Sequence, residues 1–208
     1  MKKLLIITLL FAFGQVAHAA VIDFNDGSNG AVITNQYSGL GVNFSNARYD
    51  NFISPNEASV GSSGLKLVGN GGGGDSIYSP KERNPIILTF DFGLSDFSIR
   101  SLNVGANGAR IEAFDSQLGG TLVGFDESFG LGLGVDNHPL LNISALSIFR
   151  IVLFTPLSIQ TEGMLWDNIS FTPAATNAVP IPAAVWLFGS ALAGLMGVSR
   201  KKKQALTA

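Results

Sequence analysis

Apolar and polar residues alternate with a period of two through the middle of the chain, and Gly, Asn, Asp and Ser interrupt the alternation at short intervals. This pattern is typical of antiparallel strands that bury one face and expose the other. The clearest strand, 86–92, places four apolar side chains on one face and has Pro85 at its head and Gly93 at its end as breakers. No part of this middle segment has the spacing of an amphipathic helix.

The alternation predicts ten strands. They are 21–24, 41–45, 65–68, 86–92, 97–104, 110–114, 121–125, 140–146, 149–155 and 164–172. Short strands at this spacing, separated by turn residues, favour an all-β fold, an antiparallel two-sheet sandwich of jelly-roll type. The segment 20–174 has about 155 residues, enough to bury a core of its own, so we expect it to form one domain.

The first 19 residues have the order of a secretory signal peptide. Lys2 and Lys3 precede an apolar run, Leu4–Phe13, and the small-residue pattern Ala-His-Ala follows at 17–19. The apolar run is too short to span a bilayer, which needs about 17 to 25 residues. We therefore predict that residues 1–19 are cleaved after Ala19 and that the rest of the chain is exported.

An uncharged apolar run, 181–199, lies near the other end and is followed by four cations, Arg200, Lys201, Lys202 and Lys203. At about 1.5 Å per residue this run is about 28 Å long, close to the hydrocarbon thickness of about 30 Å. The alternative, a buried core helix, does not account for the cations. Because basic clusters stay in the cytoplasm, we predict a transmembrane helix that leaves the domain outside the inner membrane.

Residues 175–208 combine a polar linker, the motif Val179-Pro180-Ile181-Pro182, the apolar run and the basic cluster. This order resembles the PEP-CTERM sorting signal, which is recognised by an exosortase, a membrane protease-transpeptidase of bacteria that make extracellular polysaccharide. Isoleucine replaces the glutamate of the name-giving Pro-Glu-Pro, which leaves the cleavage position open. The resemblance implies a protein that is anchored in the inner membrane and then sorted to the cell surface or the extracellular space.

Composition narrows the functions that the domain can serve. The chain has no cysteine, which excludes disulfides, cysteine nucleophiles and zinc sites built on Cys and His. All 15 acidic residues but only seven basic ones lie within 20–174, a net charge of −8. An acidic exported domain argues against nucleic acid as a partner and suits a solvated surface protein or one that binds cations.

Few residues of the domain suit catalysis. His138 is its only histidine, because His18 belongs to the signal peptide, and no G-x-S-x-G elbow presents a serine to it. We expect His138 to be an exposed loop residue. The glycine-rich stretch 69–75 lacks the Lys-Ser or Lys-Thr of a phosphate loop. A carboxylate pair for sugar hydrolysis has no sequence signature, so a secreted glycan-active enzyme is the alternative to the predicted non-catalytic domain.

Asp167 is the strongest local anomaly. Alternation in the last predicted strand places it on the face of Leu165, Ile169 and Phe171. An ionised carboxylate among apolar side chains is costly unless it is paired or bound to a cation. The simple interpretation is that Asp167 caps a turn or meets Arg150.

A second resemblance suggests a cation instead. Segments such as 41–45 (Gly-Val-Asn-Phe-Ser) and 166–171 (Trp-Asp-Asn-Ile-Ser-Phe) look like many PEP-CTERM ectodomains, which are similar to galactose-binding-like and carbohydrate-binding jelly rolls. In those folds the first and last strands often share a structural calcium ion. The resemblance implies Ca²⁺ held by Asp23 and Asp167, with the oxygen ligands that calcium prefers.

Aromatic residues in the first half of the domain offer a platform for sugar stacking. They are Tyr37, Tyr49, Phe52 and Tyr78, and the alternative is that they are partly buried spacers. We predict a non-enzymatic, exosortase-sorted surface or matrix protein that associates with extracellular polysaccharide. A structural coat protein without a ligand is a further alternative.

Overall fold

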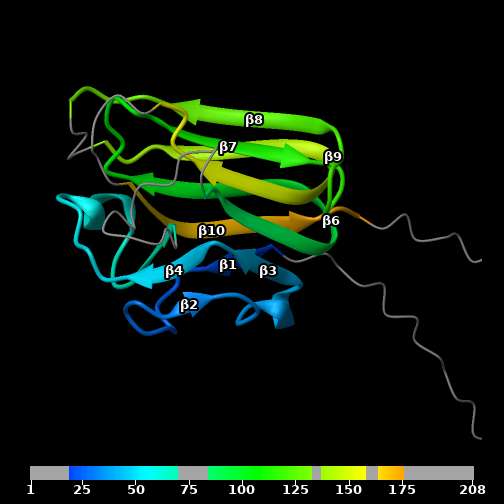
Figure 1. Ribbon diagram of the computed structural model, residues 1–208, viewed down its shortest axis with the longest axis horizontal. Coiled ribbons are helices and arrows are strands. Elements are labelled where there is room, and N and C mark those ends of the chain that lie inside the picture. The colour runs from blue at the N-terminus through cyan, green and yellow to red at the C-terminus, as the bar shows by residue number, and fades with distance from the viewer. Residues whose placement is uncertain (1–18, 70–83, 133–136, 158–163, 176–208) are drawn as a thin grey trace, which may run out of the picture. The chain divides into compact units, whose positions relative to one another are not determined.

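Ten strands and two short 3-10 helices form the described part of the chain, which comprises residues 19–69, 84–132, 137–157 and 164–175 of the computed structural model (Figure 1). The strands are β1 (Ala20–Ile22), β2 (Val32–Ile33), β3 (Val42–Ser45), β4 (Ala47–Asp50), β5 (Lys66–Gly69), β6 (Ile86–Leu102), β7 (Ala109–Phe114), β8 (Leu122–Ser128), β9 (Leu140–Phe154) and β10 (Leu165–Pro173). The helices are η1 (Ser38–Leu40) and η2 (Glu57–Val60). No helix among these residues is long and apolar enough to cross a membrane.

Several predicted features lie outside the described residues. They are the signal segment up to residue 18, Tyr78, the glycine-rich stretch after Gly69, and the tail from residue 176 with its sorting motif, apolar run and basic cluster. Export, sorting and membrane attachment therefore stay predictions.

Every strand pair is antiparallel, and two long strands connect the layers of the fold. The hydrogen-bonded order is β2-β4-β5-β10-β6-β9-β7-β8, with β1 on β10 and β3 on β6. The first half of β6 pairs with β3, whereas its second half pairs with β10. Register shifts between Thr89 and Leu94 mark the place where β6 bends from one layer into the other, because irregular pairs bend a strand.

We call the two layers sheet I and sheet II. Sheet I contains β3, the first half of β6, the second half of β9, β7 and β8. Sheet II contains β2, β4, β5, β10, β1, the second half of β6 and the first half of β9. Figure 1 shows β7 and β8 on one side of the domain and β1, β2 and β4 on the other. The predicted all-β antiparallel sandwich is confirmed.

The core lies between the sheets, and its buried side chains come from within residues 22–171. Phe90 of sheet I has its ring centroid 6.2 Å from that of Phe97 and 5.2 Å from that of Phe171, both in sheet II. All three side chains are at most 1 % exposed. Because burial of a large apolar side chain contributes about 1.5–3 kcal/mol, residues 20–174 have a substantial core of their own.

The strand boundaries differ from the prediction in two ways. The predicted pairs 86–92 with 97–104 and 140–146 with 149–155 are each one continuous strand, β6 and β9. Gly93, expected to end a strand, lies inside β6, where an added Cβ would meet Ser147 Oγ at 3.1 Å. The prediction also lacks β2 and β4, which have two and four residues.

Candidate functional site

The outer face of sheet II carries two rows of small polar side chains, with one residue from each of β10, β6 and β9 in each row. The rows are Ser170, Ser98 and Asn142, and Thr172, Asp96 and Ser144. We call these six residues the polar grid. Neighbouring strands lie about 4.8 Å apart, and successive outward residues on one strand about 7 Å apart. The grid is therefore a flat, closely spaced set of hydroxyl, amide and carboxylate groups.

A bulge in β10 brings this strand into the grid. Asp167 pairs with Arg100 and Ser170 pairs with Ser98, so β10 has one residue more than β6 over this interval. Asn168 lies in the bulge with a φ of 51°, a conformation that Asn tolerates better than most residues. The extra residue reverses the alternation, so the serine and threonine that follow it face outward and the apolar residues face the core.

Asp96 is the charged member of the polar grid. One carboxylate oxygen accepts a hydrogen bond from Ser144 Oγ and the other from Ser95 Oγ, each at 2.7 Å. These bonds hold the pKa of Asp96 below its ordinary value. The grid therefore carries one negative charge at neutral pH.

The remaining grid side chains are available to a ligand. Within the described residues, Ser98, Asn142, Ser170 and Thr172 make no side-chain hydrogen bond, and a hollow of about 110 Å³ lies among them. Their groups both donate and accept hydrogen bonds. The grid contains a single carboxylate and no histidine or lysine, so it lacks the pair of carboxylates that sugar hydrolysis uses. The free hydroxyl and amide groups of the grid can form hydrogen bonds with the hydroxyl groups of a ligand.

Asp167 faces away from Ile169, because the bulge lies between them. The expected common face is confirmed for Leu165, which precedes the bulge, and is wrong for Ile169 and Phe171, which follow it. Asp167 is 1 % exposed; Ser62 Oγ donates to its Oδ2, and the Asn168 N–H donates to its Oδ1 at 2.8 Å. Arg150, which we considered as a partner of Asp167, instead donates hydrogen bonds to backbone carbonyls of the β7–β8 loop. The carboxylate thus ties the segment after η2 to β10.

Burial raises the pKa of Asp167, and the hydrogen bond from Ser62 offsets part of this rise. Between its ordinary value of 3.8 and the raised one, the folded chain keeps a proton that the unfolded chain has released, so stability falls as the pH rises across that window. Asp167→Asn removes this contribution. As the pH rises above this ordinary value, we expect the free energy of unfolding of Asp167→Asn to increase relative to that of the wild-type domain. Parallel curves in urea titrations would show that the carboxylate does not titrate in this way.

Asp23, the other expected calcium ligand, is exposed and directly follows β1. The predicted adjacency of the first and last strands is confirmed, since Ile22 pairs with Ile169. Asp23 Oδ1 accepts a hydrogen bond from the Asn25 N–H at 3.3 Å, and across the described ranges no group of three or more His, Cys, Asp or Glu side chains could hold a metal ion. Calcium held by Asp23 and Asp167 stays a prediction. Uptake of Ca²⁺ at millimolar concentration in calorimetric titration would support it, and no uptake would remove it.

A buried ion pair near Asp167 has no signal in the sequence. Lys66 is fully buried, and its Nζ donates to Glu57 Oε1 at 2.7 Å and to the Gly64 carbonyl at 2.8 Å. The other oxygen of Glu57 accepts the Ser54 N–H at 2.7 Å. Both charges are paired away from water, so the cluster fastens η2 to β5 and offers no open site.

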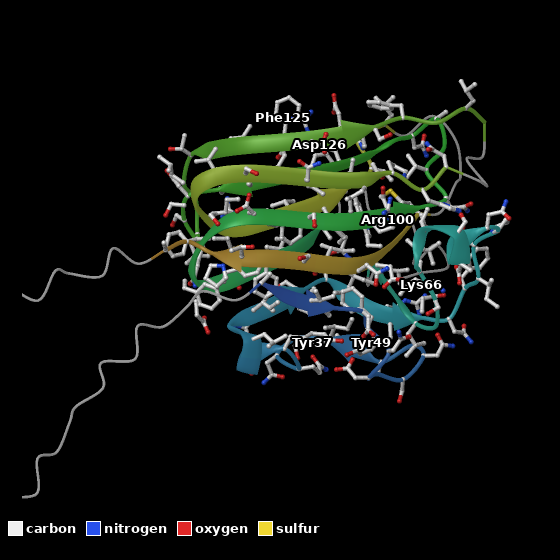
Figure 2. All side chains as sticks on the ribbon, turned by 180° about the vertical axis from the view of Figure 1, so that it is seen from behind. Tyr37, Tyr49, Lys66, Arg100, Phe125 and Asp126 are labelled. Atoms are coloured by element: carbon white, nitrogen blue, oxygen red, sulfur yellow. The ribbon has the colours of Figure 1, made fainter. Side chains whose placement is uncertain are left out.

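Tyr37 and Tyr49 are 7 % and 2 % exposed, because their rings pack around Phe24 in the core. The two tyrosines lie side by side (Figure 2), with their hydroxyls 3.1 Å apart. Tyr37 OH donates to Asp26 Oδ1 at 2.5 Å. Burial raises the pKa of Tyr37, which keeps this hydroxyl protonated. The expectation of an exposed stacking platform is wrong for these two residues, whereas Phe52 is 46 % exposed.

His138 is buried rather than exposed, which corrects the expectation of a solvated loop residue. It is 8 % exposed. Its Nδ1 accepts the Asn103 N–H at 3.2 Å, so Nε2 carries the proton and donates to the Pro55 carbonyl at 2.6 Å. Both ring nitrogens are used inside the fold, and His138 therefore links loops instead of serving a site.

No protein-family model matches the sequence, and no curated protein is significantly similar to it. Among solved structures, the chain is similar to the K2 cleaved adhesin domain of Lys-gingipain, with a TM-score of 0.47 and 10 % identity over 74 % of this chain and 99 % of that one. It is also similar to CsCBM6-3 from Clostridium stercorarium in complex with cellobiose, with a TM-score of 0.37 and 15 % identity over 74 % and 94 % of the two chains. A family 29 carbohydrate-binding module gives a TM-score of 0.39 and 12 % identity over 79 % and 99 %. These distant likenesses carry no conclusion on ligand or function.

Proposed function

We propose that this chain is an exported, exosortase-sorted protein of the cell surface or extracellular matrix, and that its β-sandwich binds polysaccharide without catalysis. The order of residues 1–19 and of residues 179–203 supports export and sorting. The polar grid carries the proposed molecular role, because it presents free hydrogen-bonding groups on an exposed sheet face.

The chemistry of the polar grid favours a polymer rich in hydroxyl groups. Each hydrogen bond contributes about 0.5–1.5 kcal/mol, so one grid binds one stretch of polymer weakly. Retention on a matrix then comes from many binding sites acting together. Because residues 20–174 carry a net charge of −8, an anionic polymer is repelled. A neutral polysaccharide is the expected ligand.

Substitution of the grid tests this proposal. We expect Ser98→Leu with Ser170→Leu to weaken retention of residues 20–174 on immobilised neutral glucans and galactans by about tenfold, because loss of two or three hydrogen bonds amounts to about 1–3 kcal/mol. Ser45→Leu, an exposed serine in β3 of sheet I, is the matched control and should leave retention unchanged. Equal retention of all three proteins would exclude the grid as the binding surface.

Processing of the tail tests the sorting half of the proposal. In cells that contain an exosortase, we expect the mass of the exported protein to lack the apolar run and the basic cluster, and in cells without the enzyme we expect these segments to remain. Replacement of Pro180 and Pro182 by alanine should block tail loss in the first strain. A tail that is lost in both strains would point to another protease.

A further inference from the structure

Strand β8 ends sheet I with an open edge. In the described part of the chain β8 pairs with β7 alone. On its inner face, Gly124 lies so close to β9 that an added Cβ would meet Ile143 Cγ2 at 2.8 Å. Strands β7 and β9 therefore hold β8 in place, and the side of β8 that faces away from β7 has no strand partner among the described residues.

Exposed apolar side chains gather along this strand and its flanks. Between 36 % and 93 % of each of six such residues is exposed, namely Leu118, Leu122, Val123, Phe125, Phe129 and Leu131. Natural proteins protect an open edge with charged side chains, especially lysine, with proline or with a very short strand. Residues 122–129 contain neither lysine nor proline, and their two acidic side chains have partners within the domain: Asp126 accepts the Asn142 N–H, and Glu127 pairs with Arg110 at 2.7 Å. A patch of this kind marks an interaction surface.

The backbone of the open edge is available at Phe125. The Glu127 N–H donates to Asp126 Oδ1 at 2.9 Å, which places this N–H on the side away from β7. Since backbone groups of alternate residues point to the same side of a strand, those of Phe125 also face the open side. The other oxygen of Asp126 accepts the Asn142 N–H of β9 at 2.8 Å and so caps the neighbouring edge of sheet II. Figure 2 shows Phe125 at the outer margin of the domain, remote from Tyr37 and Tyr49.

We propose that β8 pairs with β8 of a second copy of this chain, antiparallel and about a two-fold axis at Phe125. The pairing continues sheet I from one copy into the other and covers the apolar side chains of the edge. It does not depend on polysaccharide binding, because the polar grid lies on the outer face of sheet II.

Charge restricts the register of this pairing. A two-fold axis at Asp126 or at Glu127 would place two like charges opposite each other, which is destabilising. An axis at Phe125 places Asp126 opposite Gly124 and Glu127 opposite Val123 of the other copy, where the Glu127 N–H exchanges its bond to Asp126 Oδ1 for the Val123 carbonyl. It also brings the two Phe125 rings together as an aromatic cross-strand pair, a stabilising arrangement.

Single cysteines test the register, because the chain has no cysteine of its own. Residues directly opposite each other in an antiparallel pair have Cα atoms about 4.5–5.5 Å apart, within the range of about 4.4–6.8 Å that a disulfide spans. We expect Phe125→Cys in residues 20–174 to form an intermolecular disulfide under mild oxidation. Glu127→Cys should not, because its own counterpart lies about 13 Å further along the strand. Equal cross-linking of the two variants, or none in the first, overturns the register.

A second cross-link keeps Phe125 intact. A mixture of Val123→Cys and Glu127→Cys proteins should give the mixed disulfide in preference to either homodimer, since the proposed axis places these positions opposite each other. Homodimers in the amounts expected for random collision would contradict the pairing.

Sedimentation equilibrium tests the association itself. We expect residues 20–174 to shift from monomer to dimer with rising concentration, and Phe125→Lys to raise the dissociation constant at least tenfold. Ile53→Lys, at a position that is 75 % exposed and remote in sequence from β8, should not change it. A wild-type domain that stays monomeric into the millimolar range, or equal effects of the two substitutions, would refute the proposed dimer whatever the outcome of glycan binding.

Discussion

Lys66→Ala is expected to lower the free energy of unfolding of residues 20–174 by about 3–5 kcal/mol, because removal of one partner leaves a buried charge uncompensated. Lys66 is fully buried, and its Nζ lies 2.7 Å from Glu57 Oε1. The substitution leaves the buried Glu57 carboxylate without its cation. Urea unfolding followed by the fluorescence of Trp166, the single tryptophan of this segment, measures the loss.

A double substitution separates the stranded charge from lost packing. Lys66→Met with Glu57→Leu removes both charges and keeps apolar volume, and replacement of a buried pair in this way is often neutral or stabilising. We expect this variant to be at least about 2 kcal/mol more stable than Lys66→Ala. If both variants lose the same free energy, or if Lys66→Ala loses less than about 1 kcal/mol, the buried pair does not hold η2 as described.

Phe90→Ala is expected to be the most damaging apolar substitution of those that bridge the two sheets. The Phe90 ring contacts Phe97 and Phe171 across the core and is fully buried. Truncation of a buried phenylalanine lowers the free energy of unfolding by about 3–5 kcal/mol, because the burial energy of the ring is lost and a cavity remains. Urea denaturation of residues 20–174 should show this loss as a lower midpoint with an unchanged slope.

Phe125→Ala is the matched control for this prediction, because Phe125 belongs to the same sheet but is 53 % exposed. Exposed substitutions usually change stability by about 0.5 kcal/mol or less. The comparison is made at a concentration where the wild-type domain is monomeric, so that association does not contribute. Similar losses for the two alanine variants would mean that Phe90 does not join the sheets.

The alternation of apolar residues was sufficient to predict the sandwich but not its local irregularities. It predicts β7 and most of β10 because each strand has one face in the core. It fails at Asp167, since the bulge at Asn168 inserts one residue and reverses the faces that follow. A positive φ at one asparagine leaves no mark in the apolar pattern, so the register of β10 could not be read without its pairing partners.

Contacts between side chains that are far apart in the sequence could not be predicted either. Ser62 and Asp167 are 105 residues apart in the chain. Nothing in the sequence around Lys66 distinguishes it from a surface lysine, and only the folded structure shows that it is buried. Tyr37 and Tyr49 lie in a segment that looks polar and loop-rich, yet the rings pack on Phe24. Local sequence gives composition and periodicity, whereas burial of these groups depends on which segments cover them.

The polar grid had a partial signal in the sequence. Serine, threonine, asparagine or aspartate occupies alternate positions in the strands that contribute Ser98, Asn142 and Ser170. The pattern indicates polar outward faces, but it does not tell that these three strands are neighbours. The order β10, β6, β9 is what assembles separate polar positions into one surface.

Binding without turnover is the central claim, and one assay measures both parts. Residues 20–174 are incubated with neutral polysaccharide extracted from the producing cells' matrix, and the bound protein and newly formed reducing ends are quantified together. We predict saturable retention that Ser98→Leu with Ser170→Leu weakens about tenfold, with no new reducing ends. Retention that is unchanged by the two substitutions, or steady release of reducing ends by the wild-type domain, would contradict the claim of binding without turnover.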